Sequence, residues 1–250
     1  MSKEVLVISD IHGRGDEFKL LIRRILRYID RYKIILLGDY IGYGKNNLEV
    51  IRMLNYLKNN SDCIILKGNW EDMFYSYVRY KKSTDEVIQS KIKAFIHRGG
   101  VNSANEIFSN RAALNYYMDL IETMPSYHIE NINDDNYVFA HSGIELYKEE
   151  VTNYYDLLDA QNDFDLLWNF NFYEEIEDYS IILEDLPFKI VAGHVPTANI
   201  LQIKENENIF CFEDKVIGVD FGASKSKGSL GFVNISREGL PCIFEKVIKK

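Results

Sequence analysis

The sequence predicts an α/β protein built as a two-sheet mixed β-sandwich flanked by helices, with a helical cap insert. Short apolar runs alternate with amphipathic segments near the N-terminus, as strands joined by helices do. Later apolar runs follow one another after short turns, and an acidic, aromatic insert at about 145–186 precedes them. With 250 residues, 46% of them hydrophobic, the chain can bury a large core, and we expect residues 1–250 to form one domain.

Three strands and two helices are expected in the N-terminal third. Residues 4–9, 33–38 and 63–68 are short runs rich in Ile, Leu and Val, as buried strands are. Residues 16–32 and 47–58 carry apolar side chains every three or four positions, which predicts helices, with Asp16 as the N-cap of the first. Because strands and helices alternate, we expect right-handed crossovers and a parallel sheet.

The rest of the chain is expected to begin with helices and end with strands. Residues 71–123 have a mostly helical pattern. Further strands are expected at 127–130, 136–140, 188–193, 209–213, 216–220, 230–235 and 243–247. Since several follow one another after short turns, part of the sheet should be antiparallel. The insert is typical of a capping layer on the core, and the alternative is a rim that selects substrate or binds a protein.

Composition and charge exclude several classes of protein. The net charge of -9 argues against general nucleic-acid binding, because such proteins usually carry the opposite charge. No apolar run of about 18 residues is present, so no membrane span is expected, and the first ten residues lack the pattern of a signal peptide. Cys63, Cys211 and Cys242 are odd in number and scattered, which indicates reduced thiols and predicts a cytoplasmic location.

Polar residues of metal-binding type follow five of the predicted strands. These residues are Asp10 and His12 after the first strand, then Asp39, Asn69, His141 and His194, one after each of four others. Three of the five histidines in the chain are in this set. Because ligands bind beyond the carboxyl ends of strands in open α/β sheets, we expect these side chains to converge. Alone, Asp39 or Asn69 would more often be a cap or turn residue, and His12 could be an ordinary loop histidine.

The chemistry of this set suits two divalent ions. Carboxylate and imidazole together favour Mn, with Fe or Zn as alternatives, over Mg or Ca. The predicted arrangement is one ion on Asp10 and His12, a second on Asn69, His141 and His194, and Asp39 bridging the two. Two such ions can activate a bridging hydroxide and clamp a phosphoryl group for in-line displacement. Their charge would attract a phosphate despite the negative charge of the chain.

The ordered motifs resemble those of the calcineurin-like metallophosphoesterase superfamily, and especially its phosphoprotein phosphatases and bacterial symmetrical dinucleoside tetraphosphate hydrolases. The matching segments are S-D-I-H-G at 9–13, G-D-Y-I-G-Y-G at 38–44, G-N-W-E at 68–71, H-S-G at 141–143 and G-H-V-P-T at 193–197. The resemblance spans nearly the whole chain and implies the same fold and metal ligands. It also implies hydrolysis of a phosphoester or phosphoanhydride, in a small phosphorylated substrate or a phosphoprotein.

Several residues depart from the superfamily pattern. Trp70 stands where the family has the histidine taken as the general acid, and Gly42 where it has that histidine's partner aspartate. Tyr43 replaces an arginine that grips phosphate, and Phe170 replaces a second one. Since an indole cannot donate a proton at neutral pH, the enzyme should depend on good leaving groups or on a substitute acid. The alternative is a catalytically weakened metal- or phosphate-binding relative that acts through a partner.

Other residues could take over the missing roles. His97 is the best substitute acid, although it could simply cap a helix, and Arg98 is the best substitute for the phosphate grip. Arg14 could reach a substrate or be a solvated loop residue. Tyr43 is a candidate for substrate binding, and Trp70 could stack on a substrate or fill the space left by the histidine and aspartate.

Overall fold

The first of two β-sheets carries the N-terminal half of the candidate site. The computed structural model describes residues 3–148, 153–202, 209–235 and 241–248. Within them, the sheet has the order β10 (Cys242–Ile248), β9 (Ser229–Asn234), β1 (Glu4–Ile8), β2 (Tyr32–Leu36) and β3 (Asp62–Ile65). Strands β1, β2 and β3 are parallel, and β9 is antiparallel to both β1 and β10. The parallel part follows from the helical connections between its strands.

The second sheet carries the other half of the site. Its order is β4 (Tyr127–Ile132), β5 (Asp135–Ala140), β6 (Lys189–Ala192), β8 (Val216–Gly218) and β7 (Phe210–Phe212). Strands β5, β6 and β8 are parallel, whereas β4 and β7 are antiparallel to their neighbours. Asn133 and Asp134 join β4 to β5 with φ of 52° and 71°, the left-handed conformation of a tight hairpin turn. The predicted mixed sandwich is therefore confirmed.

Alternation along the strands gives each sheet two buried faces. In β1, Val5 and Val7 face the second sheet, whereas Leu6 and Ile8 face the helices. In β5, Phe139 belongs to the same cluster between the sheets, whereas Val138 and Ala140 face the inserted helices. The core thus has one layer between the sheets and one outside each sheet, which explains why these strands read as continuous apolar runs.

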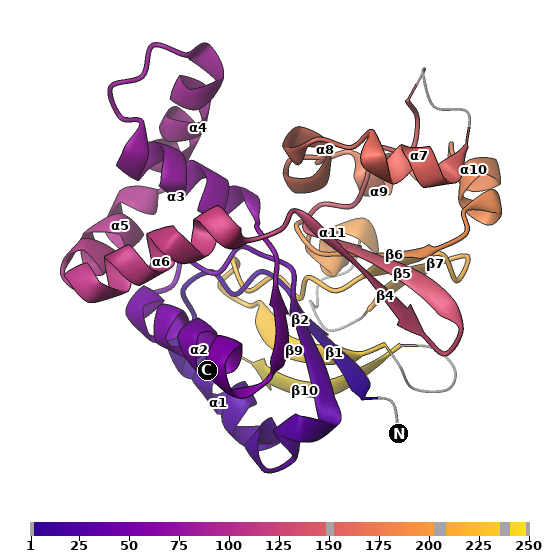
Figure 1. Cartoon of the computed structure of the whole chain (residues 1–250), viewed down its shortest axis with the longest axis horizontal. Helices are drawn as coiled ribbons and strands as arrows, with labels where there is room; N and C mark the ends of the chain where they lie inside the picture. The colour runs from indigo at the N-terminus through magenta and orange to yellow at the C-terminus, as the bar shows by residue number, and fades with distance from the viewer. Residues whose placement is uncertain (1–2, 149–152, 203–208, 236–240, 249–250) are drawn as a thin grey trace.

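Helices cover the outer face of each sheet (Figure 1). Those beside the first sheet are α1 (Gly15–Ile25), α2 (Asn47–Asn60), α3 (Asn69–Arg79), α4 (Glu86–His97), α5 (Gly100–Phe108) and α6 (Arg111–Thr123). Those of the second half are α7 (Tyr154–Asp159), α8 (Asp163–Leu167), α9 (Phe172–Glu175), α10 (Ser180–Asp185) and the short α11 (Thr197–Ile200). Of these, α3 and α4 project as a hairpin at the top left of Figure 1, opposite α7–α10.

The prediction for the first helix was wrong in two respects. The α-helix ends at Ile25 and continues as a 3-10 helix, η1 (Leu26–Arg31), because Tyr28 leaves helical geometry at φ -129°. Tyr32 already belongs to β2. The N-cap position is held by Arg14 without a side-chain cap, and Asp16 lies in the first turn, where its carboxylate accepts a hydrogen bond from Asn46. An acidic residue there still favours the helix dipole.

The acidic, aromatic insert is largely helical, as expected, although residues 149–152 of it lie outside the described residues. Its apolar side chains, including Leu167, Phe172 and Leu183, form a core with β5, β6 and β8. Trp168 packs against both this core and that of the first sheet. A capping layer is therefore present, and its segment around Trp168 connects the two halves of the molecule.

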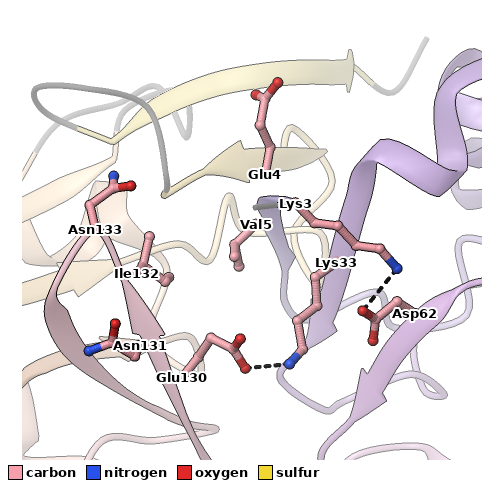
Figure 2. A pocket seen from close by; sticks show the side chains of 9 residues that line it. All are labelled: Lys3, Glu4, Val5, Lys33, Asp62, Glu130, Asn131, Ile132 and Asn133. Atoms are coloured by element: carbon pink, nitrogen blue, oxygen red, sulfur yellow. Dashed lines mark hydrogen bonds and ion pairs between the residues drawn. The ribbon is translucent and has the colours of Figure 1, made fainter. Parts of the chain in front are cut away.

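The two ends of the strands differ in chemistry. At the amino ends of β1, β2 and β3, Figure 2 shows a pocket of about 260 Å³ in which Lys3 pairs with Asp62 and Lys33 with Glu130. The six predicted metal ligands all lie on the opposite side, after the carboxyl ends of strands. Among the helices in the described ranges, none combines the length and apolarity needed to cross a bilayer.

Candidate metal centre

Asp10, His12 and Asp39 converge at the carboxyl ends of β1 and β2. The Nε2 atom of His12 lies 3.5 Å from Oδ1 of Asp10 and 3.6 Å from Oδ2 of Asp39. One potential ligand atom from each residue lies within 4.8 Å of the others. All three side chains are buried. This spacing can accommodate a divalent ion between two carboxylates and an imidazole.

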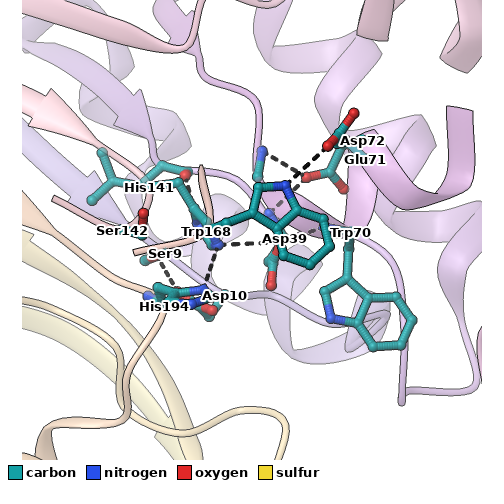
Figure 3. A network of polar contacts seen from close by, with 12 residues as sticks. Ser9, Asp10, Asp39, Trp70, Glu71, Asp72, His141, Ser142, Trp168 and His194 are labelled. Carbon is teal, nitrogen blue, oxygen red and sulfur yellow. Dashed lines mark hydrogen bonds and ion pairs between the residues drawn. The ribbon is translucent and has the colours of Figure 1, made fainter. Parts of the chain in front are cut away.

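A second group combines Asp39 with the two histidines from the other sheet. Figure 3 shows His141 and His194 facing each other, with 3.0 Å between Nε2 of His141 and Nδ1 of His194. The same Nε2 atom lies 3.4 Å from Oδ1 of Asp39. Asp39 is therefore common to both groups, with one carboxylate oxygen turned toward each.

Several buried polar atoms of the set have no hydrogen-bond partner among the described residues. They are Oδ1 of Asp10, Nδ1 of His12, Oδ1 of Asn69 and Nε2 of His194. Leaving buried acceptors unpaired is costly, so native structures rarely contain such groups without an ion or water to satisfy them. Asn69 is the first residue of α3, beside Trp70, whose backbone N–H donates to Oδ1 of Asp39 at 2.9 Å. These atoms fit a site that binds cations.

Four of the predicted ligands lie on strained backbone. Asp10, His12, Asp39 and His194 have φ of 52°, 48°, 56° and 69°, in the left-handed region that side-chain-bearing residues seldom adopt. Such strain costs about 1–3 kcal/mol per residue and persists where surrounding structure enforces it. Its concentration in four residues of one type of chemistry indicates a functional constraint on the loops at the strand ends.

The carboxylate of Glu71 ties two of these loops together. It accepts hydrogen bonds from the backbone N–H of Asp39 at 2.8 Å, of Tyr40 at 3.0 Å and of Gly68 at 3.1 Å, and from the hydroxyl of Tyr117 at 2.7 Å. Glu71 is fully buried. Sequence reasoning missed this residue, although its place two residues after Asn69 matches the third position of a helix, where a glutamate often reaches back to the cap.

Burial and crowding set the charges of the centre. Burial lowers the pKa of His141 to about 4 and, with the nearby His141 charge, that of His194 to about 3, so both imidazoles are neutral and able to bind a metal at pH 7.

Burial and then the Asp10 and Glu71 charges raise the pKa of Asp39 well above its usual range. Burial also opposes ionisation of Asp10, but its contacts with His12 and Ser9 outweigh that effect and lower the pKa. A cation would relieve the carboxylate crowding.

Trp70 fills the space beside the first group. Its side chain is only 2% exposed and makes edge contacts with His12, Tyr43 and Phe95. A Cβ atom built on Gly42, where φ is 141°, would lie 3.2 Å from the Trp70 ring and 3.0 Å from Nδ1 of His12. The indole thus occupies the room next to Gly42, which supports the filler role. Tyr43 is about half exposed, at 49%, and its ring contacts those of His12 and Trp70.

The two phosphate-binding candidates lie in different surroundings. Arg14 is buried, and its guanidinium donates to the carbonyl of Gly228 at 2.9 Å and to Glu17 at 3.1 and 3.2 Å, bonds that substrate binding would have to break. Arg98 is exposed just beyond the end of α4, and its charge contributes to the lowered pKa of His194. The Arg98 charge therefore acts on His194 in the second group.

Phe170 and Arg98 lie beside the second group, and the candidate acid His97 precedes Arg98 in the chain. His97 is the last residue of α4 and is exposed, next to Arg98. The Phe170 ring lies 4.3 Å from that of His194, centroid to centroid, and the guanidinium of Arg98 lies 5.8 Å from the Phe170 ring. The position aligned with a family arginine thus borders the site but carries an apolar ring. By contrast, the ring of His128 in β4 bonds Glu130, as a structural histidine would.

A sandwich with histidines and carboxylates converging at one edge defines a metal-binding α/β protein. The model of the calcineurin-like phosphoesterase family matches residues 3–223, and the chain belongs to this family. The family comprises enzymes that hydrolyse phosphoester bonds, and it implies divalent metal ions for which Asp10, His12, Asp39, His141 and His194 are suitable ligands. The resemblance inferred from the motifs is confirmed.

Individual relatives are similar over part of the chain. A symmetrical bis(5'-nucleosyl)-tetraphosphatase of Wigglesworthia glossinidia brevipalpis is 35% identical over 81 residues, which are 32% of this chain and 29% of that protein. A human serine/threonine-protein phosphatase with EF-hands is 32% identical over 81 residues, which are 32% of this chain and 12% of that protein. The matches thus span less than a third of either relative.

Solved structures share the fold over the whole chain. A provisionally named diadenosine tetraphosphatase covers 100% of this chain and 95% of its own, with a TM-score of 0.59 and 17% identity. A serine/threonine phosphatase from Saccharomyces cerevisiae covers 100% of this chain and 82% of its own, with a TM-score of 0.56 and 16% identity. At these identities the likeness concerns the fold alone.

Replacing Glu71 by glutamine should destabilise the protein, although the two side chains have nearly the same size. A glutamine has one acceptor oxygen and one NH₂ group. Two of the four groups that donate to Glu71 would therefore face the NH₂ group and lose their acceptor. We expect the free energy of unfolding to fall by about 2–4 kcal/mol, since each buried group left unpaired costs about 1–3 kcal/mol.

Urea denaturation of metal-free protein measures this change. Glu177→Gln is the matched control, because Glu177 is exposed, and its change should stay within about 0.5 kcal/mol. Equal stability of Glu71→Gln and the control would show that the buried carboxylate does not hold the two loops.

Proposed function

We propose that this chain hydrolyses phosphoester or phosphoanhydride bonds with two divalent ions, Mn²⁺ first among them. The observation that carries the proposal is the position of Asp39, whose two carboxylate oxygens face separate ligand groups from two different sheets. In this proposal Asp10 and His12 hold one ion, and Asn69, His141 and His194 hold the other. Bound ions would supply a nucleophile at neutral pH and positive charge for the phosphoryl group.

The residues of the chain would orient the reacting groups. The bond from the backbone N–H of Trp70 to Asp39 fixes one carboxylate oxygen toward His141. The bond from His141 Nδ1 to the carbonyl of Leu37, at 3.0 Å, fixes the tautomer in which Nε2 is the unprotonated nitrogen that would bind metal. Arg98 would attract and orient the phosphate from solvent, as a substitute for the missing family arginines.

The proposed chemistry lacks one ordinary component, a positioned general acid. Trp70 cannot supply a proton, and Gly42 offers no carboxylate to orient one. Loss of general-acid help typically removes 10²–10⁴ in rate. The reaction should therefore favour leaving groups that depart without a proton, unless His97 substitutes.

The natural substrate would be a small phosphorylated molecule or a phosphoprotein. Similarity to a bis(5'-nucleosyl)-tetraphosphatase and to a serine/threonine phosphatase supports both classes. Cys63, Cys211 and Cys242 form no disulfide within the described part of the chain, which supports a cytoplasmic location. We further propose that residues 1–250 act as one domain.

A second candidate function is a weakened relative that binds metal or phosphate and acts through a partner. The joint replacement of the acid histidine and its aspartate by Trp70 and Gly42 favours this alternative, because the two losses are matched. Hydrolysis of an aryl phosphate with Mn²⁺ added separates the two functions. Turnover supports the enzyme, and metal-dependent phosphate binding without turnover supports the alternative.

Removing the shared ligand should affect both ions. We expect the wild-type chain loaded with Mn²⁺ to bind about two ions, and Asp39→Asn to bind fewer and to lose activity, because the neutral amide cannot bridge two cations. Elemental analysis of dialysed protein measures the ratio. Asp119→Asn, at an exposed position on α6, is the control and should retain both ions. A single ion in the wild type, or full occupancy in Asp39→Asn, would contradict the bridging role.

Leaving-group chemistry should dominate the rates. We expect kcat/KM for 4-nitrophenyl phosphate or a nucleotide anhydride to exceed that for phosphoserine peptides by about 10² or more, because only the serine alkoxide needs a proton to leave. Steady-state kinetics with Mn²⁺ measure both. Equal values would mean that another acid acts, and His97→Asn would then be expected to lower only the phosphoserine rate.

Restoring the acid histidine alone should not restore a full phosphatase. Trp70→His lacks a carboxylate partner, so its protonated form would be less favoured and its orientation loose. We expect phosphoserine activity to change by about tenfold or less, below the usual span for a positioned acid. A thousandfold increase would show that the partner carboxylate is dispensable.

The partner position has its own constraint. Gly42→Asp alone should be strained, because φ is 141° and the new Cβ would meet the Trp70 ring at 3.2 Å. The smaller imidazole of Trp70→His opens this space, so the double variant should exceed the product of the single effects. A four-member cycle with kcat/KM and a melting curve for each protein tests this coupling, and multiplicative single effects would contradict it.

A further inference from the structure

An aromatic and acidic pocket adjoins the second ligand group. The pocket has a volume of about 280 Å³, and its lining includes Phe164, Trp168, Phe170, Glu145 and Glu175. We call it the aromatic–acidic pocket. Phe170 is the wall that it shares with the metal centre, because the same ring lies 4.3 Å from that of His194. A group attached to a phosphate bound at the centre could therefore extend into this pocket.

The pocket offers rings and unneutralised carboxylates together. Phe164 is 68% exposed and Phe170 44% exposed, so both rings present apolar surface to a ligand. Asp165, which also lines the pocket, is paired with Lys148 at 2.5 Å. Within the ranges that the structure describes, Glu145 and Glu175 form no ion pair with a basic side chain, and the only side-chain bond of Glu145 is a long one, 3.4 Å, from the N–H of Tyr147. The carboxylates of Glu145 and Glu175 are therefore available to pair with the cation of a ligand.

The floor of the pocket is fixed to the metal centre. The backbone N–H of Asn169 donates to Ser142 Oγ at 3.0 Å, next to His141. The indole N–H of Trp168 donates to Asp72 at 3.0 Å, a bond visible in Figure 3, and so anchors the pocket to α3. Since both anchors lead to segments that carry predicted metal ligands, a group in the pocket would be held at a fixed distance from the phosphate.

We propose that the aromatic–acidic pocket binds an organic cation, an ammonium or guanidinium group, carried by the leaving group of the substrate. Aromatic faces and carboxylates together recognise such a cation, by cation–π attraction and by charge. Arg98 already places a guanidinium 5.8 Å from the Phe170 ring. The preferred substrate would thus be bipolar, with its phosphate at the metals and its cation in the pocket. A polyphosphate leaving group would instead meet two carboxylates.

This inference rests on the proposed hydrolysis, and a matched pair of substrates separates the two. Phosphotyramine and N-acetylphosphotyramine have the same phenolic leaving group, but only the first carries a cation. We expect kcat/KM to be about tenfold higher for phosphotyramine with Mn²⁺ at pH 7.5 and low salt, and the ratio to shrink as salt is added. Phosphotyrosine peptides with lysine or norleucine two residues after the phosphotyrosine form the second arm, which reports whether a peptide can supply the cation.

Variants assign the preference to the pocket. The double variant Glu145→Gln with Glu175→Gln should bring the ratio close to one, and Phe164→Leu should lower it about two- to fivefold, the usual contribution of an exposed cation–π contact. Glu174→Gln is the control on the same helix, since Glu174 is exposed and does not line the pocket, and it should keep the ratio.

The outcomes are distinct. A ratio near one in the wild type for both arms, or an unchanged ratio in the double variant, would overturn the cation site even if 4-nitrophenyl phosphate is hydrolysed. If neither phosphate esters nor a nucleotide anhydride are hydrolysed, the proposed hydrolysis fails. Calorimetry on the Mn²⁺-loaded chain then tests the cation site through the Kd values of phosphotyramine and its N-acetyl form. About tenfold tighter binding of phosphotyramine supports the site, and equal Kd values overturn it.

Discussion

The hydrogen bonds of one buried carboxylate determine the geometry of the candidate metal centre. Glu71 gathers the backbone N–H groups of Asp39, Tyr40 and Gly68, so the loops after β2 and β3 are held at one point. A carboxylate with no exposure is tolerable only because donors surround it. The same contacts fix where Asp39 points and where α3 begins, and hence the placement of Asn69. The hydrogen bonds of Glu71 therefore hold the two loops in place whether or not a metal is bound.

Strain in the ligand loops is balanced by specific bonds. The N–H of His12 donates to the carbonyl of Asp39 at 2.9 Å, and the N–H of His194 donates to Oδ2 of Asp10 at 2.9 Å. These bonds join the first strand end to the second and to the other sheet. Left-handed backbone at Asp10, His12, Asp39 and His194 turns each side chain inward as its strand ends. The sandwich thus supplies the rigidity, and the loops supply the ligands.

Much of this arrangement could be predicted from the sequence, for physical reasons. Buried parallel strands are continuous apolar runs in the sequence. The end of each run therefore marks the end of a strand, and a polar residue such as Asp39 or His141 follows it. Their convergence follows from sheet geometry alone. Helix boundaries were less predictable, because Tyr28 breaks the pattern of the first helix through backbone geometry that apolar spacing does not encode.

Contacts between distant segments could not be predicted in the same way. The bond of Arg14 to Gly228 joins residues 214 positions apart, and nothing local to Arg14 distinguishes it from a solvated arginine. The contact between Phe170 and His194 could not be predicted either, because it joins distant segments. Phe170 matters because its ring lies between the metal centre and the aromatic–acidic pocket. Trp70 and Gly42 were noticed as a joint departure from the family pattern, and their contact gives that departure a steric reason.

The most direct test of the central claim is a crystal structure of the Mn²⁺-soaked protein with anomalous difference maps. The account predicts two peaks flanking the Asp39 carboxylate, one in contact with Asp10 and His12 and the other with Asn69, His141 and His194. One peak alone, or two peaks that do not share Asp39, would contradict it.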